Sequence, residues 1–89
     1  MKKIKSSLEN SRQQSLQKMG QLIKAERKNR NLTQTQLSEL SDSSINFISQ
    51  IEAGKATAHI GKVFRVLQVL GFELHFLRGS KGLVIADGL

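Results

Sequence analysis

The side chains best suited to recognition chemistry are two amides four residues apart, Asn46 and Gln50, in a stretch that predicts a helix. Residues four apart lie on one helix face, and an Asn or Gln amide forms paired hydrogen bonds with adenine in the major groove of DNA. The neighbouring Ile45 and Phe47 are apolar and suit a thymine methyl group. Two alternatives stay open: the Phe47 ring can turn into the core, and Asn46 can be an ordinary solvated helix residue.

Catalytic chemistry is not predicted by the remaining polar residues. The histidines, His59 and His75, lack a spaced Asp, Glu or His partner that would indicate a metal site or an acid–base pair. The chain has no Cys, hence no thiol nucleophile, disulfide or cysteine metal site. Its seven Gly are scattered and form no phosphate-binding loop. We therefore expect no enzyme activity, no metal and no cofactor.

Positive charge is concentrated at the N-terminal end of the chain. Residues 1–30 contain nine Lys or Arg against Glu9 and Glu26, a net charge of +7. Residues 31–89 contain five basic and five acidic groups, so this part is neutral. Clustered positive charge attracts polyanions, nucleic acid above all, because bound cations release condensed counterions. A basic surface without a partner is the alternative.

Length and hydropathy predict one small domain. With 89 residues, a domain buries only roughly 60–65% of its unfolded surface, so pairing with a second copy would help it hide apolar area. No apolar run approaches the roughly 20 residues of a membrane span. The basic segment Met1 to Lys5 is not followed by an apolar stretch, so a secretory signal is not predicted. The expectation is a cytoplasmic protein without a membrane partner.

Apolar spacing predicts an all-α bundle that begins after a polar segment. Residues 1–14 are basic and lack a sustained period, which indicates a flexible arm that becomes helical only near its end. From Ser15 the apolar residues recur at helical spacing. The first helix is expected to end at Asn29-Arg30-Asn31, because Asn tolerates the left-handed conformation found at helix C-termini.

Two short helices joined by a tight turn are expected next. Thr33 is a plausible N-cap for the first of them, and Ser44 for the second, which should run from Ile45 to Glu52. The turn between them, Ser41-Asp42-Ser43, is rich in residues that hydrogen-bond their own backbone. In a helix-turn-helix protein, the second helix of such a pair enters the major groove of DNA while the first crosses the backbone.

The end of the chain predicts a fourth helix and a hairpin. The helix should start at Thr57 or His59 and close at Gly71. Residues 72–77 alternate like a strand, 78–82 form a turn, and 83–85 form a second short strand. An isolated hairpin is marginal in water, so we expect it to pair with something, most simply with a twin strand of a second subunit. The domain organisation is therefore an arm (1–14), a DNA-binding domain (15–71) and a dimerisation tail (72–89).

Two motifs span the predicted helix pair, Leu32-Thr33-Gln34-x-x-Leu37-Ser38-Glu39-Leu40 and Ser44-x-x-x-Ile48-Ser49-x-Ile51-Glu52-x-Gly54-Lys55. Their spacing resembles the phage-repressor-like (Xre or Cro/C1) helix-turn-helix family, and the resemblance runs from about Leu16 to Gly71. It implies an all-α, four- to five-helix lambda-repressor-like bundle, here with a short C-terminal β-strand or hairpin used in dimerisation.

Matched positions in that family suggest roles for residues of this chain. Gln34 resembles a residue that touches a phosphate and braces the recognition helix. Arg27 and Glu52 resemble a structural ion pair, with an ordinary solvent-facing helix end as the alternative for Glu52. The positions at which family members contact base edges, or that lie one turn further on, correspond to Ser44, Ile45, Asn46, Phe47, Ser49 and Gln50.

The helix pair departs from the family in charge and in its turn. Residues 33–52 contain three acidic residues and no Lys or Arg, a net charge of −3. Phosphate attraction must therefore come from helix N-termini, from Lys55 and Lys62, and from the arm and the first helix. Asp42 stands where the family usually has Gly, and Ser43 where it usually has an apolar residue, so looser packing is expected under the turn.

The last helix and the segment after it contain the stretch Val66-Leu67-Gln68-Val69-Leu70-Gly71-Phe72-Glu73-Leu74-His75-Phe76. This stretch resembles the end of HipB-type antitoxins. In those proteins a strand after the last helix pairs with its copy across the dimer, which implies a dimerisation role for Phe72, Leu74 and Phe76. The resemblance implies a homodimer that represses its own operon at a palindromic operator in double-stranded DNA and binds a HipA-like serine/threonine kinase toxin. Two alternatives stay open: a stand-alone repressor of phage or chromosomal origin, and a protein-interaction module that keeps the fold only as a scaffold.

Overall fold

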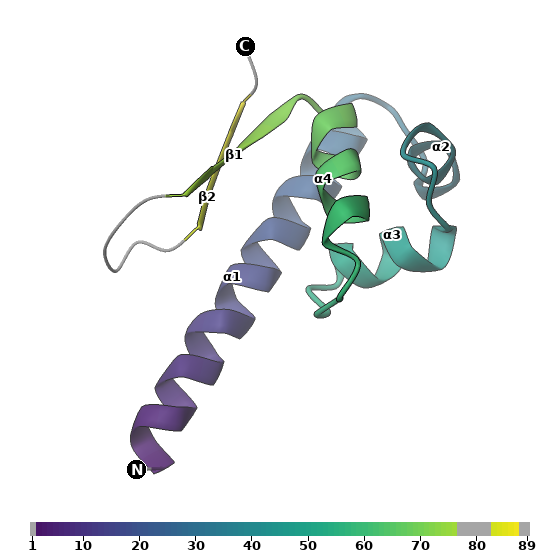
Figure 1. The fold of residues 1–89 in the computed structure, drawn as a ribbon. Helices are drawn as coiled ribbons and strands as arrows, with labels where there is room; N and C mark the ends of the chain where they lie inside the picture. Colours follow the sequence, from purple (N-terminus) through teal and green to yellow (C-terminus); the bar gives the residue numbers. More distant parts are fainter. Residues whose placement is uncertain (1, 77–82, 88–89) are drawn as a thin grey trace.

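The structure is a computed structural model that describes the backbone of residues 2–76 and 83–87 and the side chains of residues 12–75. Within this part, four helices form a bundle and a two-stranded antiparallel sheet follows (Figure 1). The predicted all-α bundle with a short C-terminal hairpin is confirmed. The elements are α1 (Lys2–Asn29), α2 (Gln34–Leu40), α3 (Ile45–Glu52), α4 (Ile60–Val69), β1 (Phe72–Phe76) and β2 (Leu83–Asp87).

The first helix is longer than the sequence pattern predicts. Residues 2–14, expected as a flexible arm, are continuous with the rest of α1, which comprises 28 residues. At 1.5 Å per residue such a helix is about 42 Å long, close to the 44 Å longest dimension of the molecule. Residues 2–14 contain no Gly or Pro, and Lys, Leu, Glu, Gln and Arg favour helix. The segment thus extends the helix although its sequence has no sustained apolar period.

The core lies where α1, α2, α3 and α4 meet. Each helix contributes a side chain with no measurable exposure: Ile23 from α1, Leu37 from α2, Ile48 from α3 and Val66 from α4. Full burial of one such side chain stabilises the fold by about 1.5–3 kcal/mol. The rest of the core cluster consists of Phe47, Ile51, Val63, Leu67 and Leu70.

One glycine permits close contact between α1 and α3. A Cβ atom on Gly20 would lie 2.5 Å from the carbonyl oxygen of Ile51 and 2.6 Å from that of Glu52. Contacts this short do not occur between a Cβ and a backbone oxygen, so any other residue would push the two helices apart. Gly20 therefore sets the distance between α1 and the C-terminal end of α3.

The helix ends follow the predicted capping residues closely. Thr33 caps α2 in a reciprocal capping box, accepting from Gln36 N at 3.0 Å while the Gln36 side chain accepts from Thr33 N at 2.8 Å. Asn31 takes the left-handed conformation (φ 57°) just beyond α1, and Gly54 does so (φ 80°) beyond α3. The sequence leaves Thr57 and His59 open as the start of the fourth helix. His59 is its N-cap residue, and the helix begins at Ile60.

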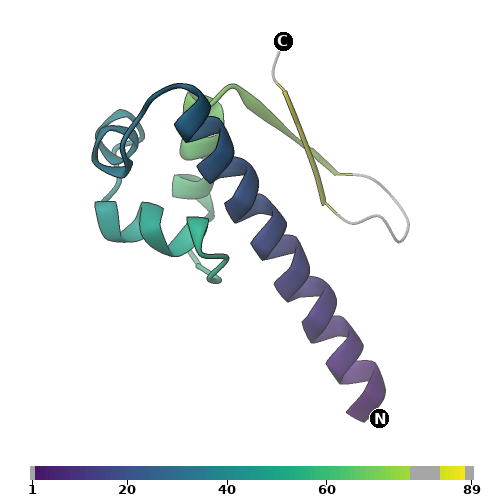
Figure 2. The same cartoon turned by 180° about the vertical axis from the view of Figure 1, so that it is seen from behind.

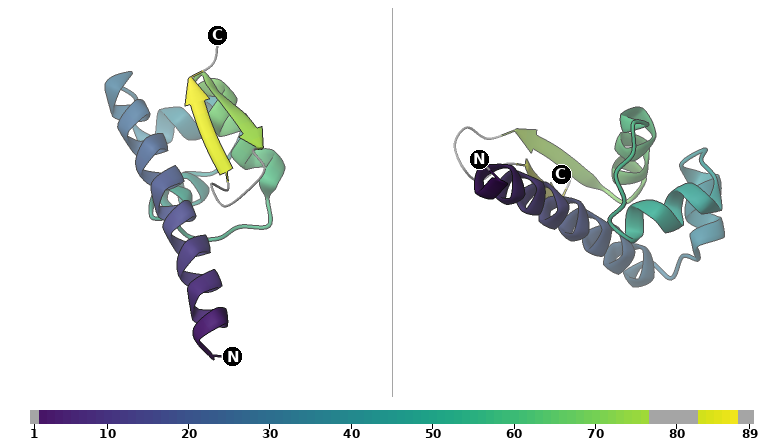
Figure 3. Two further views of the ribbon diagram at one scale, coloured as in Figure 1. Left: turned by 90° about the vertical axis from the view of Figure 1, so that its left-hand side faces the viewer. Right: turned by 90° about the horizontal axis from the view of Figure 1, so that it is seen from below.

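The C-terminal strands pair with each other within the chain. β1 and β2 are antiparallel, with Phe72 opposite Asp87 and Phe76 opposite Leu83. β1 also packs against α4, as the views in Figure 3 show. The predicted hairpin therefore forms, and α4 is the element of the bundle that β1 packs against. The predicted turn at 78–82 lies outside the described residues.

Candidate nucleic-acid interface

The turn between α2 and α3 is closed by its own serines and backbone. Ser41 Oγ donates to Leu37 O at 2.7 Å, and Ser43 N donates to Ser38 O at 2.8 Å. Asp42 takes the left-handed conformation, with φ 53°, which Asp tolerates better than most residues. The tight turn that the helix pair requires therefore forms without the expected glycine.

Polar contacts replace apolar packing beneath this turn. Ser43, where an apolar residue was expected, is half-buried, and its Oγ lies 2.8 Å from Ser41 Oγ. Asp42 forms an ion pair with Arg65 of the fourth helix, whose Nη1 lies 3.1 Å from Asp42 Oδ2. Both side chains of that pair are strongly solvated, so its contribution to stability is small.

The third helix has a buried inner face and an exposed outer face. The inner face consists of Phe47, Ile48, Ile51 and Glu52. The outer face consists of Ile45, Asn46, Ser49 and Gln50, all of them exposed. Four predicted base-contacting side chains are thus brought onto one accessible surface, where residues three or four positions apart lie side by side. Among them Ile45 is an apolar side chain that is 47% exposed.

Phe47 does not belong to that outer face, which corrects its inclusion among base-contacting residues. The side chain is 7% exposed and part of the core cluster. It lies four residues before Ile51, so both point into the bundle. Its ring packs edge-on against His59, with ring centroids 6.5 Å apart, and Lys62 Nζ lies 5.9 Å from its centroid. The core alternative for Phe47 is therefore the correct one.

Ser44 acts as the N-cap of the third helix. Its Oγ accepts a hydrogen bond from Phe47 N at 3.0 Å, which leaves the hydroxyl hydrogen free to donate outward. Ser44 is exposed, and it lies at the helix end where backbone N–H groups and the helix dipole favour an anion. The geometry suits a phosphate contact better than a contact with a base edge.

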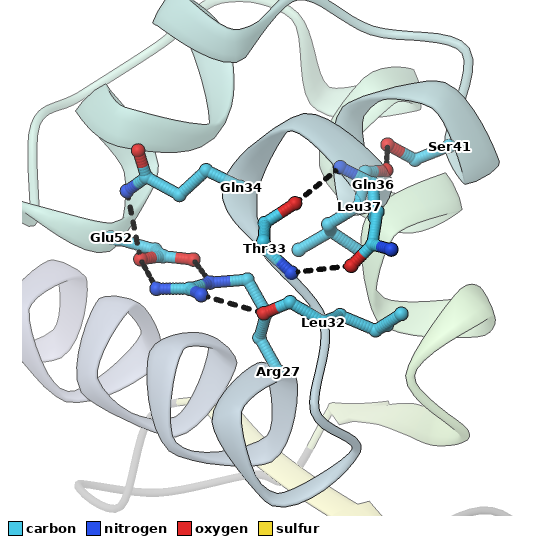
Figure 4. Close-up of polar contacts among 8 residues, drawn as sticks. All are labelled: Arg27, Leu32, Thr33, Gln34, Gln36, Leu37, Ser41 and Glu52. Carbon is cyan, nitrogen blue, oxygen red and sulfur yellow. Dashed lines mark hydrogen bonds and ion pairs between the residues drawn. The ribbon is translucent and has the colours of Figure 1, made fainter.

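A buried cluster joins the third helix to the first two (Figure 4). Arg27 from α1 forms a two-pronged ion pair with Glu52: Nε lies 2.7 Å from Oε2 and Nη2 3.0 Å from Oε1. Only 9% and 3% of the two side chains are exposed. Arg27 Nη1 also donates to Leu32 O at 2.8 Å, in the α1–α2 connection. The solvent-facing alternative for Glu52 is therefore excluded.

The ion pair favours the charged form of Arg27. The hydrogen bond with Glu52 raises the pKa of Arg27 above its ordinary value, although burial works in the opposite direction. A planar guanidinium matched to a carboxylate gives the geometry that a buried ion pair requires. Removing either partner would leave an uncompensated buried charge.

Gln34, at the start of α2, is held by the same carboxylate. Its Nε2 donates to Glu52 Oε1 at 3.1 Å. An amide nitrogen carries two hydrogens, so one remains for a further acceptor outside the cluster. Gln34 is half-buried, and its amide orientation is set by Glu52, which Arg27 holds in place. This arrangement suits the bracing and phosphate-contacting role that the resemblance implies.

Sequence reasoning missed the residues of α1 that contact the end of the third helix. Gln13 Nε2 donates to Gly54 O at 3.4 Å, and a Cβ on Gly54 would lie 3.0 Å from Gln17 Cγ. The predicted phosphate-contacting Lys55 follows directly and is exposed. A search for apolar periodicity passes over polar residues such as these, and the four-residue spacing of the two glutamines is the one pattern that could have indicated them.

The predicted dimerisation residues lie at the opposite end of the chain from α1. Phe72 and Leu74 are half-buried against the core and line a cavity of about 480 Å³ between α4 and β1. Phe64 and Leu67 line the same cavity from α4. The side chain of Phe76 lies outside the described residues, although its backbone is part of β1. The cavity presents apolar side chains, of which Phe64 is 37% exposed.

Among the described residues, no group of His, Cys, Asp or Glu is arranged to hold a metal ion. None of the helices in this part of the chain is both long and apolar enough to cross a membrane. The candidate site is the surface formed by the two short helices and the segments next to them, where the outer face of α3 is exposed.

Comparison with known proteins identifies the class. Residues 23–77 match the helix-turn-helix family. The match covers more than half of the chain, which therefore belongs to this family of DNA-binding transcription regulators and is of the Xre and Cro/C1-like type. The chain is also similar to the uncharacterized HTH-type transcriptional regulator y4mF of Sinorhizobium fredii. The two are 44% identical over 59 residues, which is 66% of this chain and 78% of that relative.

Proposed function

We propose that the protein is a sequence-specific repressor that inserts α3 into the major groove of operator DNA. The observation that carries this proposal is the outer face of α3, where Asn46 and Gln50 stand exposed while the inner face is buried. Amide side chains suit adenine, and the exposed Ile45 suits a thymine methyl group. Ser49 adds a hydroxyl that can donate or accept a hydrogen bond at a base edge.

Phosphate contacts flank this face in the proposed complex. The free amide hydrogen of Gln34, the N-terminal end of α3 at Ser44 and the exposed Lys55 supply donors around α3. Such contacts set the register and orientation of the protein but carry no sequence information. They also compensate for the net charge of −3 on residues 33–52.

A homodimer is the second part of the proposal. An isolated hairpin is marginal in water, and the cavity beside β1 leaves apolar side chains of Phe64, Phe72 and Leu74 accessible. A second copy that covers this surface through β1, including Phe76, would place two α3 helices on one duplex. The operator would then be palindromic, with half-sites separated by about one helical turn, roughly 34 Å.

The experiment that tests base recognition is selection of duplexes from a random library, followed by affinity measurements on the selected sequence and its point variants. Asn46→Ala should relax preference at one base position and cost about 1–3 kcal/mol there. Asn29→Ala, at an exposed amide on the end of α1, is the matched control and should leave base preference unchanged. An equal loss on every duplex would show that Asn46 does not contact a base, and failure to select any sequence would refute the function.

The resemblance of the chain end to HipB-type antitoxins supports a finer proposal, that the repressor controls its own operon and binds a HipA-like serine/threonine kinase toxin. Co-expression with the neighbouring reading frame tests it: a kinase-like product that co-purifies with the protein supports the antitoxin role. A repressor that binds its promoter but has no such neighbour would instead be a stand-alone regulator.

The acidic helix pair favours one competing function, a protein-interaction module that does not bind DNA. The exposed Ile45 would then anchor a protein partner. A salt series separates the two functions, because binding to DNA weakens steeply with salt whereas an apolar contact responds little.

A further inference from the structure

The N-terminal half of α1 extends beyond the bundle as a helix. Figures 1 and 2 show α3 at the lower edge of the bundle and α1 continuing below it to the N-terminus. Residues 2–14 form this extension, about 20 Å of helix at 1.5 Å per residue. It leaves the bundle at the level of α3 and runs obliquely away from α2.

We propose that this extension is a second DNA-contacting element: a rigid basic helix that lies against the phosphates beside the groove occupied by α3. The inference rests on the proposed function, because it takes the position of the duplex from α3. It differs from the flexible arm expected from sequence, because a helix fixes where the positive charge is held.

Contacts between α1 and the end of α3 set the position of the extension. Gln13 donates to Gly54 O at 3.4 Å, and Gln17 lies against Gly54 one turn further along α1. Gly54 takes a left-handed conformation (φ 80°) and is followed by the exposed Lys55. The extension therefore leaves the bundle next to the loop that the proposed complex places on the DNA backbone.

Charge complementarity favours DNA as the partner of the N-terminal extension of α1. Residues 2–14 contain four basic residues and one acidic residue, a net charge of +3. Residues 33–52, the two helices with the turn between them, carry −3 and would by themselves be repelled by a phosphate backbone. A positively charged helix that continues α1 past the end of α3 would offset that repulsion, and its helical backbone loses little conformational freedom on binding.

The test compares charge removal with loss of helix at unchanged charge. A triple variant, Lys2→Gln, Lys3→Gln and Lys5→Gln, removes three positive charges. Gln14→Pro keeps every charge. Proline interrupts the helix in the turn before it but is tolerated in the first turn of a helix, so the part of α1 after position 14 can remain helical while the extension is separated from it. Gln14→Ala, at the same exposed position, is the matched control.

Affinity is measured between 50 and 200 mM salt for two duplexes of equal length, the selected operator and a mixed sequence. Each phosphate contact contributes about −0.9 to the slope of log affinity against log salt. The triple variant should lose up to about 2.7 of slope, so that over this range the wild type weakens by about 40-fold more than the variant. Gln14→Pro should lose a comparable slope, and Gln14→Ala should match the wild type.

Two results would overturn the proposal. If the triple variant keeps the wild-type slope, the extension does not touch phosphate. If Gln14→Pro keeps it while the triple variant loses it, the segment acts as a flexible tether and its helical form is irrelevant. The ratio of operator affinity to mixed-sequence affinity reports on the proposed function separately. Loss of a phosphate contact weakens binding to both duplexes alike and leaves this ratio unchanged. Circular dichroism establishes that each variant keeps the folded bundle.

Discussion

Replacing Gly20 by alanine tests whether contact between α1 and α3 is as close as the structure describes. Alanine would normally stabilise the middle of a helix by about 0.8–1 kcal/mol relative to glycine. Here the added Cβ would lie 2.5 Å and 2.6 Å from the carbonyl oxygens of Ile51 and Glu52. Backbone atoms in two packed helices cannot give way as a flexible side chain can.

The expected effect is the difference between these two terms. Relief of the contact requires α3 to move away from α1, and overpacking of this kind costs about 1–3 kcal/mol. Because two backbone oxygens are affected, we take the upper half of that range and subtract the helix-propensity gain, which leaves a net destabilisation of about 1–2 kcal/mol. For a domain of this size that lowers Tm by roughly 5–15 °C.

Urea and thermal unfolding of Gly20→Ala measure this directly, with Gly61→Ala as the control. Gly61 is also helical, but a Cβ there meets nothing within 4 Å, so the same substitution should be neutral or stabilise by up to about 1 kcal/mol. Opposite signs for the two variants would support the described packing. A Gly20→Ala protein at least as stable as the wild type would refute it, since the steric cost would then be absent.

Two further predictions concern residues that hold the helix pair. Glu52→Ala should destabilise the protein by about 3–5 kcal/mol in urea unfolding, because it leaves the buried charge of Arg27 without a partner. The double variant Arg27→Met/Glu52→Leu should recover most of this loss. A small effect of Glu52→Ala would mean that the pair is solvated. Thr33→Ala should cost about 1 kcal/mol by removing the N-cap of α2, whereas Thr33→Ser should be nearly neutral; equal losses for both would show that the capping hydroxyl does not contribute.

Local chemistry made the helix pair predictable from sequence. Thr33 and Ser44 are N-cap residues whose side-chain oxygens accept from backbone N–H groups two or three residues on, and the structure places both at helix starts. Gly54 follows the third helix with φ 80°, as a residue without a Cβ allows. Such boundaries depend on a few neighbouring residues, so the sequence contains the information that determines them.

Features that depend on distant parts of the chain were not predictable in the same way. The direction of Phe47 is decided by packing, because the spacing from Phe47 to Ile51 fits the core while the sequence motif places position 47 among base-contacting residues. Gly20 has no local role in a turn or cap, and its importance arises only because α3 passes close to it. Residues 2–14 lack an apolar stripe, so periodicity could not indicate that α1 continues through them.

The separation of the two faces of α3 has a consequence for how such regulators diverge. Ile48, Ile51 and Glu52 are buried and hold the helix in place, while Asn46, Ser49 and Gln50 are exposed. In the proposed complex, exchanges at the second set would therefore redirect the protein to a different operator with little change in folding stability. Gene duplicates could acquire new target sites by mutation of a few solvent-exposed codons, long before the scaffold itself had changed.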